Sequence, residues 1–169
     1  MSTVEQEGDL VEPERSRPRI PSEYGIATGD KGMLDWWQVN ESLESAPFYW
    51  LSTVGPEGEP HAMPVDGLWV DNALYFGGAP QTKWARNLEG NPRLVVHIEA
   101  GEMAVILEAV AEFGQPDDAT FERLAAGSKV KYGYGPETNS EMWCARPHKA
   151  FAWSYKQFGE TATRWRFGE

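Results

Sequence analysis

FYWLSTV-GPEG-EPHAMPV, residues 48–65, begins a segment that extends to His97 and predicts the central strands of the protein. Phe48 to Val54 is rich in aromatic and β-branched side chains, which favour a pleated, half-buried strand. Gly55-Pro56-Glu57-Gly58 has proline second and glycine last, a pattern typical of a tight turn. The returning run, Pro60 to Val70, completes a hairpin. Because Pro64 cannot donate to a ladder, we expect an edge or bulged strand whose free backbone can meet a ligand.

A short helix with two cations in its first turns is predicted after the strand Leu74-Tyr75-Phe76. Thr82 is placed to cap this helix. Lys83, Arg86 and Asn87 lie at i, i+3 and i+4 and are expected to share one face. Positive side chains oppose the helix dipole at this end unless an anion compensates them. We interpret the helix start as a phosphate seat, although spacing alone leaves a solvated helix face with an ordinary cap equally open.

Composition narrows the classes of partner. The 169 residues carry a net charge of -11, which disfavours nucleic acid and anionic membranes, whereas a phosphate ligand needs only a local basic pocket. Cys144 is the single cysteine, so an intramolecular disulfide is excluded and a reducing cytosol is favoured. No apolar run approaches the roughly 20 residues of a membrane span. Met1 to Asp9 lacks the apolar region of a signal peptide. We therefore expect a cytoplasmic protein without nucleic-acid or membrane partners.

The rest of the chain is expected to form one domain over residues 22–169, preceded by a disordered acidic and proline-rich tail over residues 1–21. Apolar spacing predicts helices over Leu34–Leu43, with Asp35 as cap, and Pro116–Ala125, which begins with proline and acidic residues. Lys129 to Thr138, with its glycines, is interpreted as a loop.

Further strands are predicted over Arg93–Ile98, Met103–Phe113, Ala150–Tyr155 and Thr161–Phe167, the last two separated by a turn at Gly159-Glu160. Six or seven strands with few helices between them indicate a mainly β protein, an antiparallel sheet closed into a small barrel. Core packing is the favoured explanation for Trp143, Trp153 and Trp165.

The order and spacing of these segments resemble the flavin/deazaflavin oxidoreductase superfamily, which includes the pyridoxamine 5'-phosphate oxidase-like split barrels, and most closely its actinobacterial branch that uses coenzyme F420. The resemblance runs from about Tyr24 to the C-terminus. The segments that show the resemblance are YWLSTV (49–54), GEPHAMPV (58–65), LYF (74–76), KWARNL (83–88) and NPR (91–93). It implies a homodimeric split β-barrel of the FMN-binding type, with the cofactor in a groove between protomers.

The resemblance also implies which residues contact the cofactor. The backbone from His61 through Met63 and Pro64 to Val65 matches the strand that contacts the flavin-like ring in the family, and His61, Met63 and Val65 alternate onto one face of that strand. The phosphate is implied to lie at the loop and helix start, where Lys83 is the first choice and Arg86, the better bidentate partner, the second. The residues implied there are Gln81, Thr82, Lys83, Arg86 and Asn87.

The function implied is hydride transfer between coenzyme F420 and a small organic substrate, without an identifiable catalytic side chain. One alternative is an FMN-dependent oxidoreductase of the same family. The other is a non-catalytic protein that binds flavin, deazaflavin or haem. The resemblance does not name the substrate.

Other chemistries lack a signal in the sequence. His61, His97 and His148 have no metal-ligand spacing with one another or with Cys144, so no metal site is expected. The chain contains no Gly-x-Ser-x-Gly elbow, no P-loop and no Gly-x-Gly-x-x-Gly after a strand. Serine hydrolysis, nucleotide hydrolysis and a Rossmann cofactor site therefore have no support.

Overall fold

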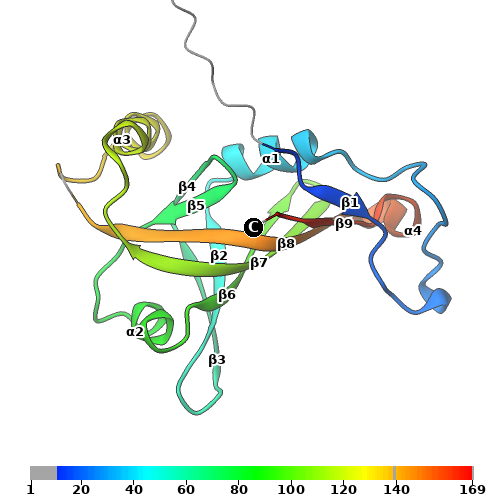
Figure 1. The fold of residues 1–169 in the computed structure, drawn as a ribbon, viewed down its shortest axis with the longest axis horizontal. Coiled ribbons are helices and arrows are strands. Elements are labelled where there is room, and N and C mark those ends of the chain that lie inside the picture. Colours follow the sequence, from blue (N-terminus) through cyan, green and yellow to red (C-terminus); the bar gives the residue numbers. More distant parts are fainter. Residues whose placement is uncertain (1–10, 139, 169) are drawn as a thin grey trace, which may run out of the picture.

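The computed structural model describes residues 11–138 and 140–168, and within them nine strands form one antiparallel sheet (Figure 1). The strands pair in the order β1-β9-β8-β7-β6-β2-β3, while the β4–β5 hairpin joins the sheet through β5 and β8. The strands are β1 (Glu14–Ser16), β2 (Tyr49–Val54), β3 (Pro60–Val65), β4 (Leu68–Val70), β5 (Ala73–Phe76), β6 (Arg93–Ala100), β7 (Met103–Gly114), β8 (Met142–Ser154) and β9 (Thr163–Arg166). The helices are η1 (Ser22–Tyr24), α1 (Trp36–Ser45), α2 (Lys83–Gly90), α3 (Asp118–Tyr132), η2 (Tyr155–Gln157) and α4 (Phe158–Thr161).

Strand β8 pairs with three other strands and so connects the parts of the sheet. One of its edges pairs with β7 over nearly its whole length, while the other edge pairs with β5 in its first half and with β9 in its second half. Strand β3 ends the strand order on the opposite side and leads into β4 through Asp66 and Gly67 alone. The mainly β, antiparallel architecture with few helices agrees with the prediction and is consistent with a split barrel.

The core is a row of apolar side chains that crosses the sheet in register. Leu51 on β2 lies opposite Val96, and the row continues through Leu107 and Ala150 to Trp165 on β9. All five residues are fully buried. Because side chains alternate between the two faces of a strand, the neighbouring row must point out of the core. The two faces of the sheet therefore have different environments.

The first hairpin forms at the predicted turn, but the returning run predicted over Pro60–Val70 is divided: β3 ends at Val65, and Leu68–Val70 is β4, which pairs with β5. The Gly58 amide donates to the Gly55 carbonyl at 2.9 Å, and Gly58 has a φ of +86°, a conformation that side chains with a Cβ rarely adopt. Strand β3 pairs only with β2, so the expectation that the strand containing Pro64 is an edge strand is confirmed. One edge of β3 is thus without a neighbouring strand among the described residues.

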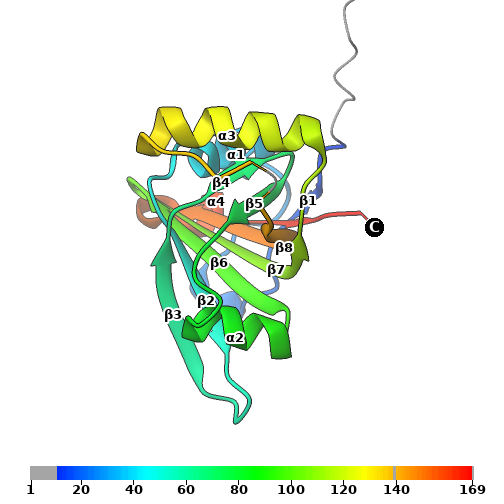
Figure 2. The same cartoon turned by 90° about the vertical axis from the view of Figure 1, so that its left-hand side faces the viewer.

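Helices α2 and α3 lie on opposite sides of the β4–β5 hairpin, and the β2–β3 hairpin extends beside α2 (Figure 2). Helix α1, predicted over Leu34–Leu43, buries Trp36, Val39 and Leu43. The Asp35 amide that precedes this helix donates to the Gln38 side chain at 2.9 Å. Within the described residues, no helix is long and apolar enough to cross a membrane.

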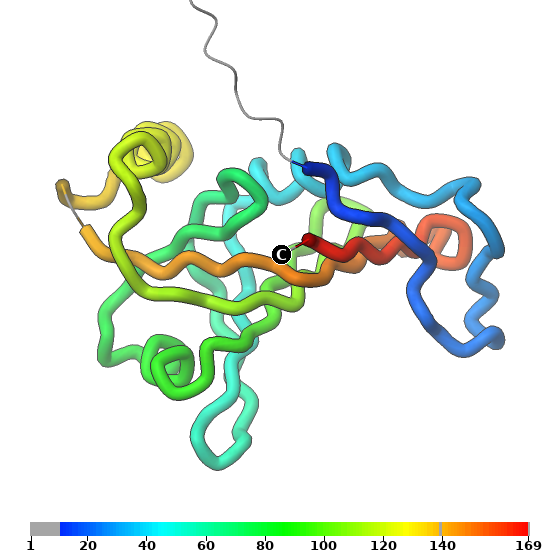
Figure 3. Tube along the Cα trace, viewed as in Figure 1, coloured from blue at the N-terminus to red at the C-terminus, as the bar shows by residue number. Residues whose placement is uncertain are grey.

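The prediction of a disordered tail to Pro21 is corrected over Glu14–Ser16, which forms β1 and pairs with β9. Figure 3 shows this N-terminal segment beside the C-terminal strand. The guanidinium of Arg17 fixes the connection by donating to the carbonyls of Gly29, Lys31 and Glu160 at 2.6–2.9 Å. Residues 1–10 of the predicted tail lie outside the described residues.

Several boundaries near the C-terminal half also differ from the prediction: β8 begins at Met142 and not at Ala150, and β9 begins at Thr163 and not at Thr161. Helix α3 begins at Asp118, after Pro116, and continues to Tyr132, so the expected loop over Lys129–Thr138 begins only at Gly133. The predicted turn at Gly159-Glu160 is the short helix α4. Gly133 stops α3 because it adopts a left-handed conformation at the C-cap, where its amide donates to the Lys129 carbonyl at 3.0 Å.

Candidate functional site

A cavity of about 710 Å³ lies between the β2–β3 hairpin and one face of α2, from Lys83 to Asn91, and we call it the cation cavity. It is lined by Val54, Gly55, Pro56, Glu59, Lys83, Arg86, Asn87, Gly90 and Asn91. The predicted phosphate residues Lys83, Arg86 and Asn87 are thus brought together with the turn of the hairpin. Gln81 is exposed and does not belong to this lining.

The start of α2 is fixed by the predicted cap. The Thr82 side chain accepts from the Ala85 amide at 3.4 Å and donates to the Ala79 carbonyl at 2.9 Å. Trp84 anchors the helix inward, since it is 3% exposed and packs against Phe76 with ring centroids 5.5 Å apart. This anchoring holds the first turn of α2 against the sheet.

The two cations of α2 face solvent and the cation cavity. Neither the Lys83 ammonium nor the Arg86 guanidinium forms a hydrogen bond or ion pair with any other residue that the structure describes. Glu59 lines the same cavity, but its carboxylate lies against Gly55, where an added Cβ would come within 2.4 Å of its oxygen. The cavity therefore holds two cations and one carboxylate, which leaves a positive balance.

The prediction that Asn87 lies on the same helix face as Lys83 and Arg86 is only partly correct. It is 5% exposed, and its amide nitrogen donates to the Thr53 hydroxyl at 3.0 Å, so it joins α2 to β2 instead of lying in solvent with Lys83 and Arg86. Thr53 itself is 1% exposed. Burial of an amide requires such a partner. Asn87 therefore positions the helix, while still forming part of the cavity wall.

The predicted ring-contacting strand is β3. Its register places His61, Met63 and Val65 opposite the buried residues of β2, so they share the inner face as the alternation predicted. Met63 is nonetheless 44% exposed, and Pro64 is exposed on the other face opposite Trp50. The contacts of these β3 residues with a cofactor ring stay predictions.

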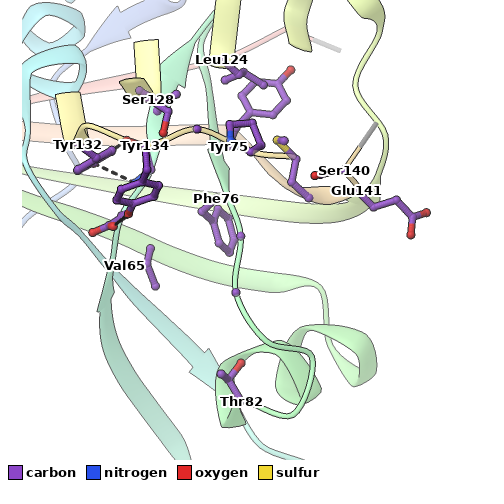
Figure 4. A pocket seen from close by; sticks show the side chains of 18 of the residues that line it. Val65, Tyr75, Phe76, Thr82, Leu124, Ser128, Tyr132, Tyr134, Ser140 and Glu141 are labelled. Carbon is purple, nitrogen blue, oxygen red and sulfur yellow. Dashed lines mark hydrogen bonds between the residues drawn. The ribbon is translucent and has the colours of Figure 1, made fainter. Parts of the chain in front are cut away.

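A second cavity of about 400 Å³ lies on the other side of the β4–β5 hairpin, beneath α3, and we call it the tyrosine chamber (Figure 4). Its lining combines apolar side chains with hydroxyls and two carboxylates: Val65, Asp66, Gly67, Leu68, Tyr75, Phe76, Gly77, Gly78, Thr82, Trp84, Leu124, Ser128, Tyr132, Tyr134, Gly135, Pro136, Ser140, Glu141 and Met142. Of the predicted site residues, Val65 and Thr82 belong to it. The chamber as a whole was not predicted.

Tyr132 ties α3 to the segment that follows β3. Its hydroxyl accepts from the Gly67 amide at 3.1 Å and contacts the carbonyls of Gly67 and Pro47 at 2.9 Å each. Tyr134 stacks on Tyr132 with centroids 5.8 Å apart and donates its hydroxyl proton to Asp66. These bonds fix one wall of the chamber.

Lys131 lies behind this wall. Its ammonium donates to the Tyr49 hydroxyl at 3.0 Å and to the carbonyls of Gly67 and Glu44 at 3.2 and 3.4 Å. Burial lowers the pKa of Lys131, while the charge of Asp66 opposes that shift. Burial also raises the pKa of Tyr49 and of Tyr132. All three donors of Lys131 are thus used within the fold.

A second polar group lies beneath α3 on β5 and β8. Tyr75 pairs with Cys144 in the sheet, and its hydroxyl is 3.5 Å from the Arg146 guanidinium. Burial raises the pKa of the Cys144 thiol and of the Tyr75 phenol, so neither is activated for nucleophilic chemistry. Within residues 11–138 and 140–168, no three histidine, cysteine or acidic side chains are close enough to hold a metal ion.

The fold belongs to the class of mainly β proteins built on one antiparallel sheet with few helices, and two cations line a cavity beside this sheet. Residues 37–154 match the family described as pyridoxamine 5'-phosphate oxidase, which is more than half of the chain. The chain therefore belongs to the pyridoxamine 5'-phosphate oxidase-like family. No curated protein sequence matches it.

Solved structures share this fold at low sequence identity. The conserved hypothetical protein Rv2991 of Mycobacterium tuberculosis aligns with a TM-score of 0.60 and 18% identity, covering 80% of this chain and 90% of that one. An F420 reductase aligns with a TM-score of 0.51 and 19% identity over 65% and 94% of the two chains. A pyridoxamine 5'-phosphate oxidase-like protein of Listeria innocua gives 0.53 and 19% over 67% and 93%. Identities this low establish the fold alone.

Proposed function

We propose that the protein is an oxidoreductase that binds coenzyme F420 with its phosphate in the cation cavity and transfers hydride between the deazaflavin and a small organic substrate. The observation that carries the proposal is the pair of cations, Lys83 and Arg86, which line a cavity without a partner among the described residues. Membership of a flavin-binding family and the structural likeness to an F420 reductase support the choice of cofactor.

The residues present fit the phosphate of such a cofactor. Arg86 offers a planar fork for two phosphate oxygens and Lys83 offers a point charge beside it. A bound phosphate would relieve the repulsion between these charges. The same arrangement suits FMN, which also carries a phosphate, so FMN is the alternative cofactor.

When bound, the deazaflavin supplies the hydride chemistry, and the chain positions and shields it. The predicted positioning elements are the strand from His61 to Val65, whose outer edge is unpaired among the described residues, and the α2 start. The Thr53–Asn87 bond holds α2 at a fixed distance from β2. A displacement of the phosphate seat would therefore displace the ring relative to the substrate.

The test is titration of the purified protein with coenzyme F420 and, separately, with FMN, followed by quenching of tryptophan fluorescence. The double variant Lys83→Ala/Arg86→Ala should weaken binding of the preferred cofactor by more than tenfold, since each charge-assisted hydrogen bond contributes about 1.5–3 kcal/mol. Lys129→Ala, which removes an exposed cation on α3, is the matched control and should leave affinity unchanged.

The substitution Glu59→Gln, at the same cavity, should strengthen cofactor binding where the double variant weakens it. It removes the one carboxylate in the lining, so the affinity for a phosphate-bearing cofactor should rise by a fewfold. Unchanged affinity in the folded double variant would refute the phosphate seat. Preference for FMN over F420 would move the protein to the FMN-dependent alternative, and binding of neither would refute the proposed function.

We further propose that the protein is a homodimer that associates through the outer face of the sheet. A row in register crosses this face from Trp50 on β2 through His97 and Ile106 to Phe151 on β8. Trp50 is 43% exposed and stacks on His97 with centroids 6.1 Å apart, while Ile106 and Phe151 are only partly buried. A second copy of this face would remove these apolar side chains from water.

A further inference from the structure

The cation cavity has a carboxylate on the wall opposite its two cations. Among the described residues that line the cavity, Lys83 and Arg86 are the cations and Glu59 is the carboxylate. Glu59 follows the turn of the β2–β3 hairpin, whereas both cations belong to α2. It forms no ion pair with either of them in the part of the chain that the structure describes. An anion in the cavity would therefore be attracted by α2 and repelled by the hairpin.

The hairpin turn fixes the place of this carboxylate. The Gly55 amide donates to the Glu59 carbonyl at 2.8 Å, and the Gly58 amide donates to the Gly55 carbonyl at 2.9 Å, so Glu59 returns to the side of Gly55. The carboxylate then lies over Gly55, where an added Cβ would be 2.4 Å from the Glu59 Oε2 atom and 3.6 Å from the Asn87 Oδ1 atom. Glycine at position 55 leaves the room that the carboxylate occupies.

The carboxylate lies near the part of α2 that carries the cations. Asn87, which approaches the same point above Gly55, is one helical turn after Lys83 and next to Arg86. Asn87 is buried and bonded to Thr53, so this part of the helix has a fixed position relative to the hairpin. The Glu59 side chain itself is exposed, and solvent screens its charge. Its effect on a bound anion is therefore expected to be a few fold.

The strength of this repulsion depends on the charge of the phosphate. A phosphate monoester carries close to two negative charges at about pH 8, since its second pKa is about 6, whereas a diester carries one. Because the Coulomb energy is proportional to the product of the charges, a carboxylate repels the monoester about twice as strongly in free energy. A fold-change in the affinity for the diester therefore becomes its square for the monoester. FMN is a monoester, and the phosphate of coenzyme F420 is a diester.

We propose that Glu59 is a specificity-determining residue, which weakens the binding of phosphate monoesters relative to phosphate diesters and so disfavours FMN in the cation cavity. The assignment rests on the proposed function, since it treats this cavity as the phosphate seat of the cofactor. A carboxylate that served only the conformation of the hairpin turn would change the affinity for both kinds of ester equally. The dependence on ligand charge therefore distinguishes the two roles.

The test uses flavins that differ only at the phosphate, because coenzyme F420 carries further carboxylates beyond its diester. The ligands are FMN, riboflavin 4′,5′-cyclic phosphate as the diester, and riboflavin as the ligand without phosphate. Each is titrated by calorimetry into the full chain and into its Glu59→Gln variant at about pH 8 and low ionic strength, where screening is weakest. Coenzyme F420 is titrated into the same preparations.

The substitution Glu59→Gln should raise the affinity for the cyclic diester by about twofold and the affinity for FMN by about fourfold. The ratio of the two dissociation constants should thus change by about twofold in favour of FMN, while the affinity for riboflavin stays the same. Glu57→Gln is the matched control, since Glu57 is an exposed carboxylate of the same turn that does not line the cavity. It should leave the ratio unchanged.

An unchanged ratio in the folded Glu59→Gln protein would overturn the assignment, as would flavin phosphates that bind no more tightly than riboflavin. The outcomes also separate this assignment from the proposed function. If F420 binds and Lys83→Ala/Arg86→Ala weakens its binding while Glu59→Gln leaves the ratio unchanged, the role of Glu59 fails and the proposed function stands. If the ratio changes as expected but F420 does not bind, the role of Glu59 is supported and F420-dependent function is refuted.

Discussion

The buried bond between Asn87 and Thr53 offers a quantitative test of how the cationic helix is held. The amide nitrogen donates to the hydroxyl at 3.0 Å, and the two residues are 5% and 1% exposed. Thr53→Val preserves the shape of the side chain but leaves the Asn87 amide without its partner. Such a loss costs about 1–3 kcal/mol, so we expect the free energy of unfolding to fall by about 2 kcal/mol.

A double-mutant cycle isolates the bond from the other effects of each substitution. Thr53→Val, Asn87→Ala and the double variant are unfolded in urea at one protein concentration, because dimerisation would make apparent stability depend on concentration. Tryptophan fluorescence reports the transition in a chain with eight tryptophans. The double variant should lose about 1–2 kcal/mol less than the sum of the single variants.

Thr53→Ser is the matched control, since it keeps the hydroxyl and removes only a buried methyl group worth about 0.8 kcal/mol. Additivity of the two single variants within about 0.5 kcal/mol would show that the bond does not couple α2 to β2, and it would refute the positioning role of Asn87. Weaker binding of coenzyme F420 by the Thr53→Val protein would connect the bond to the proposed phosphate seat.

Three further predictions concern other parts of the molecule. Burial raises the pKa of the Tyr49 phenol above its ordinary 10.0, so the neutral phenol stabilises the folded state fully below pH 10, and this contribution is lost as the pH rises through the folded-state pKa. In Tyr49→Phe, the free energy of unfolding in urea should therefore depend less on pH between 9 and 11. The same pH dependence as in the wild type would contradict this. Ile106→Asp places a charge on the proposed dimer face and should give a monomer in analytical ultracentrifugation, whereas Val130→Asp, at a position 89% exposed on α3, should not. Leu124→Ala removes a side chain that is 1% exposed, so it should lower the free energy of unfolding by about 2–4 kcal/mol and speed hydrogen exchange in α3. Exchange at the wild-type rate would rule out Leu124 as the residue that holds this helix on the sheet.

Local chemistry was sufficient to predict several elements from the sequence. Aromatic and β-branched residues with a Gly-Pro turn identify the β2–β3 hairpin, and the ring of Pro64 marks an edge strand because it lacks a donor. Thr82 caps α2 as predicted, because its side chain accepts a hydrogen bond from the amide three residues later. The common position of Lys83 and Arg86 at one cavity follows from their spacing on this helix.

Other features depend on partners far along the chain, and no local pattern indicates them. Strand β1 has three polar residues and forms because β9 offers it an edge about 150 residues away. Lys131 and Tyr132 remain helical where a loop was predicted, since their side chains bond to the Gly67 region some 65 residues earlier. Asn87 turns inward because Thr53 lies within reach of its amide.

The mainly β class and the cationic start of α2 could therefore be predicted from local patterns, because both depend on residues a few positions apart. The chamber enclosed by the segment at Asp66, the end of α3 and the loop at Tyr134 appears only once the chain is folded. A cavity is formed by packing between elements distant in sequence, whereas caps, turns and alternation are formed within one element.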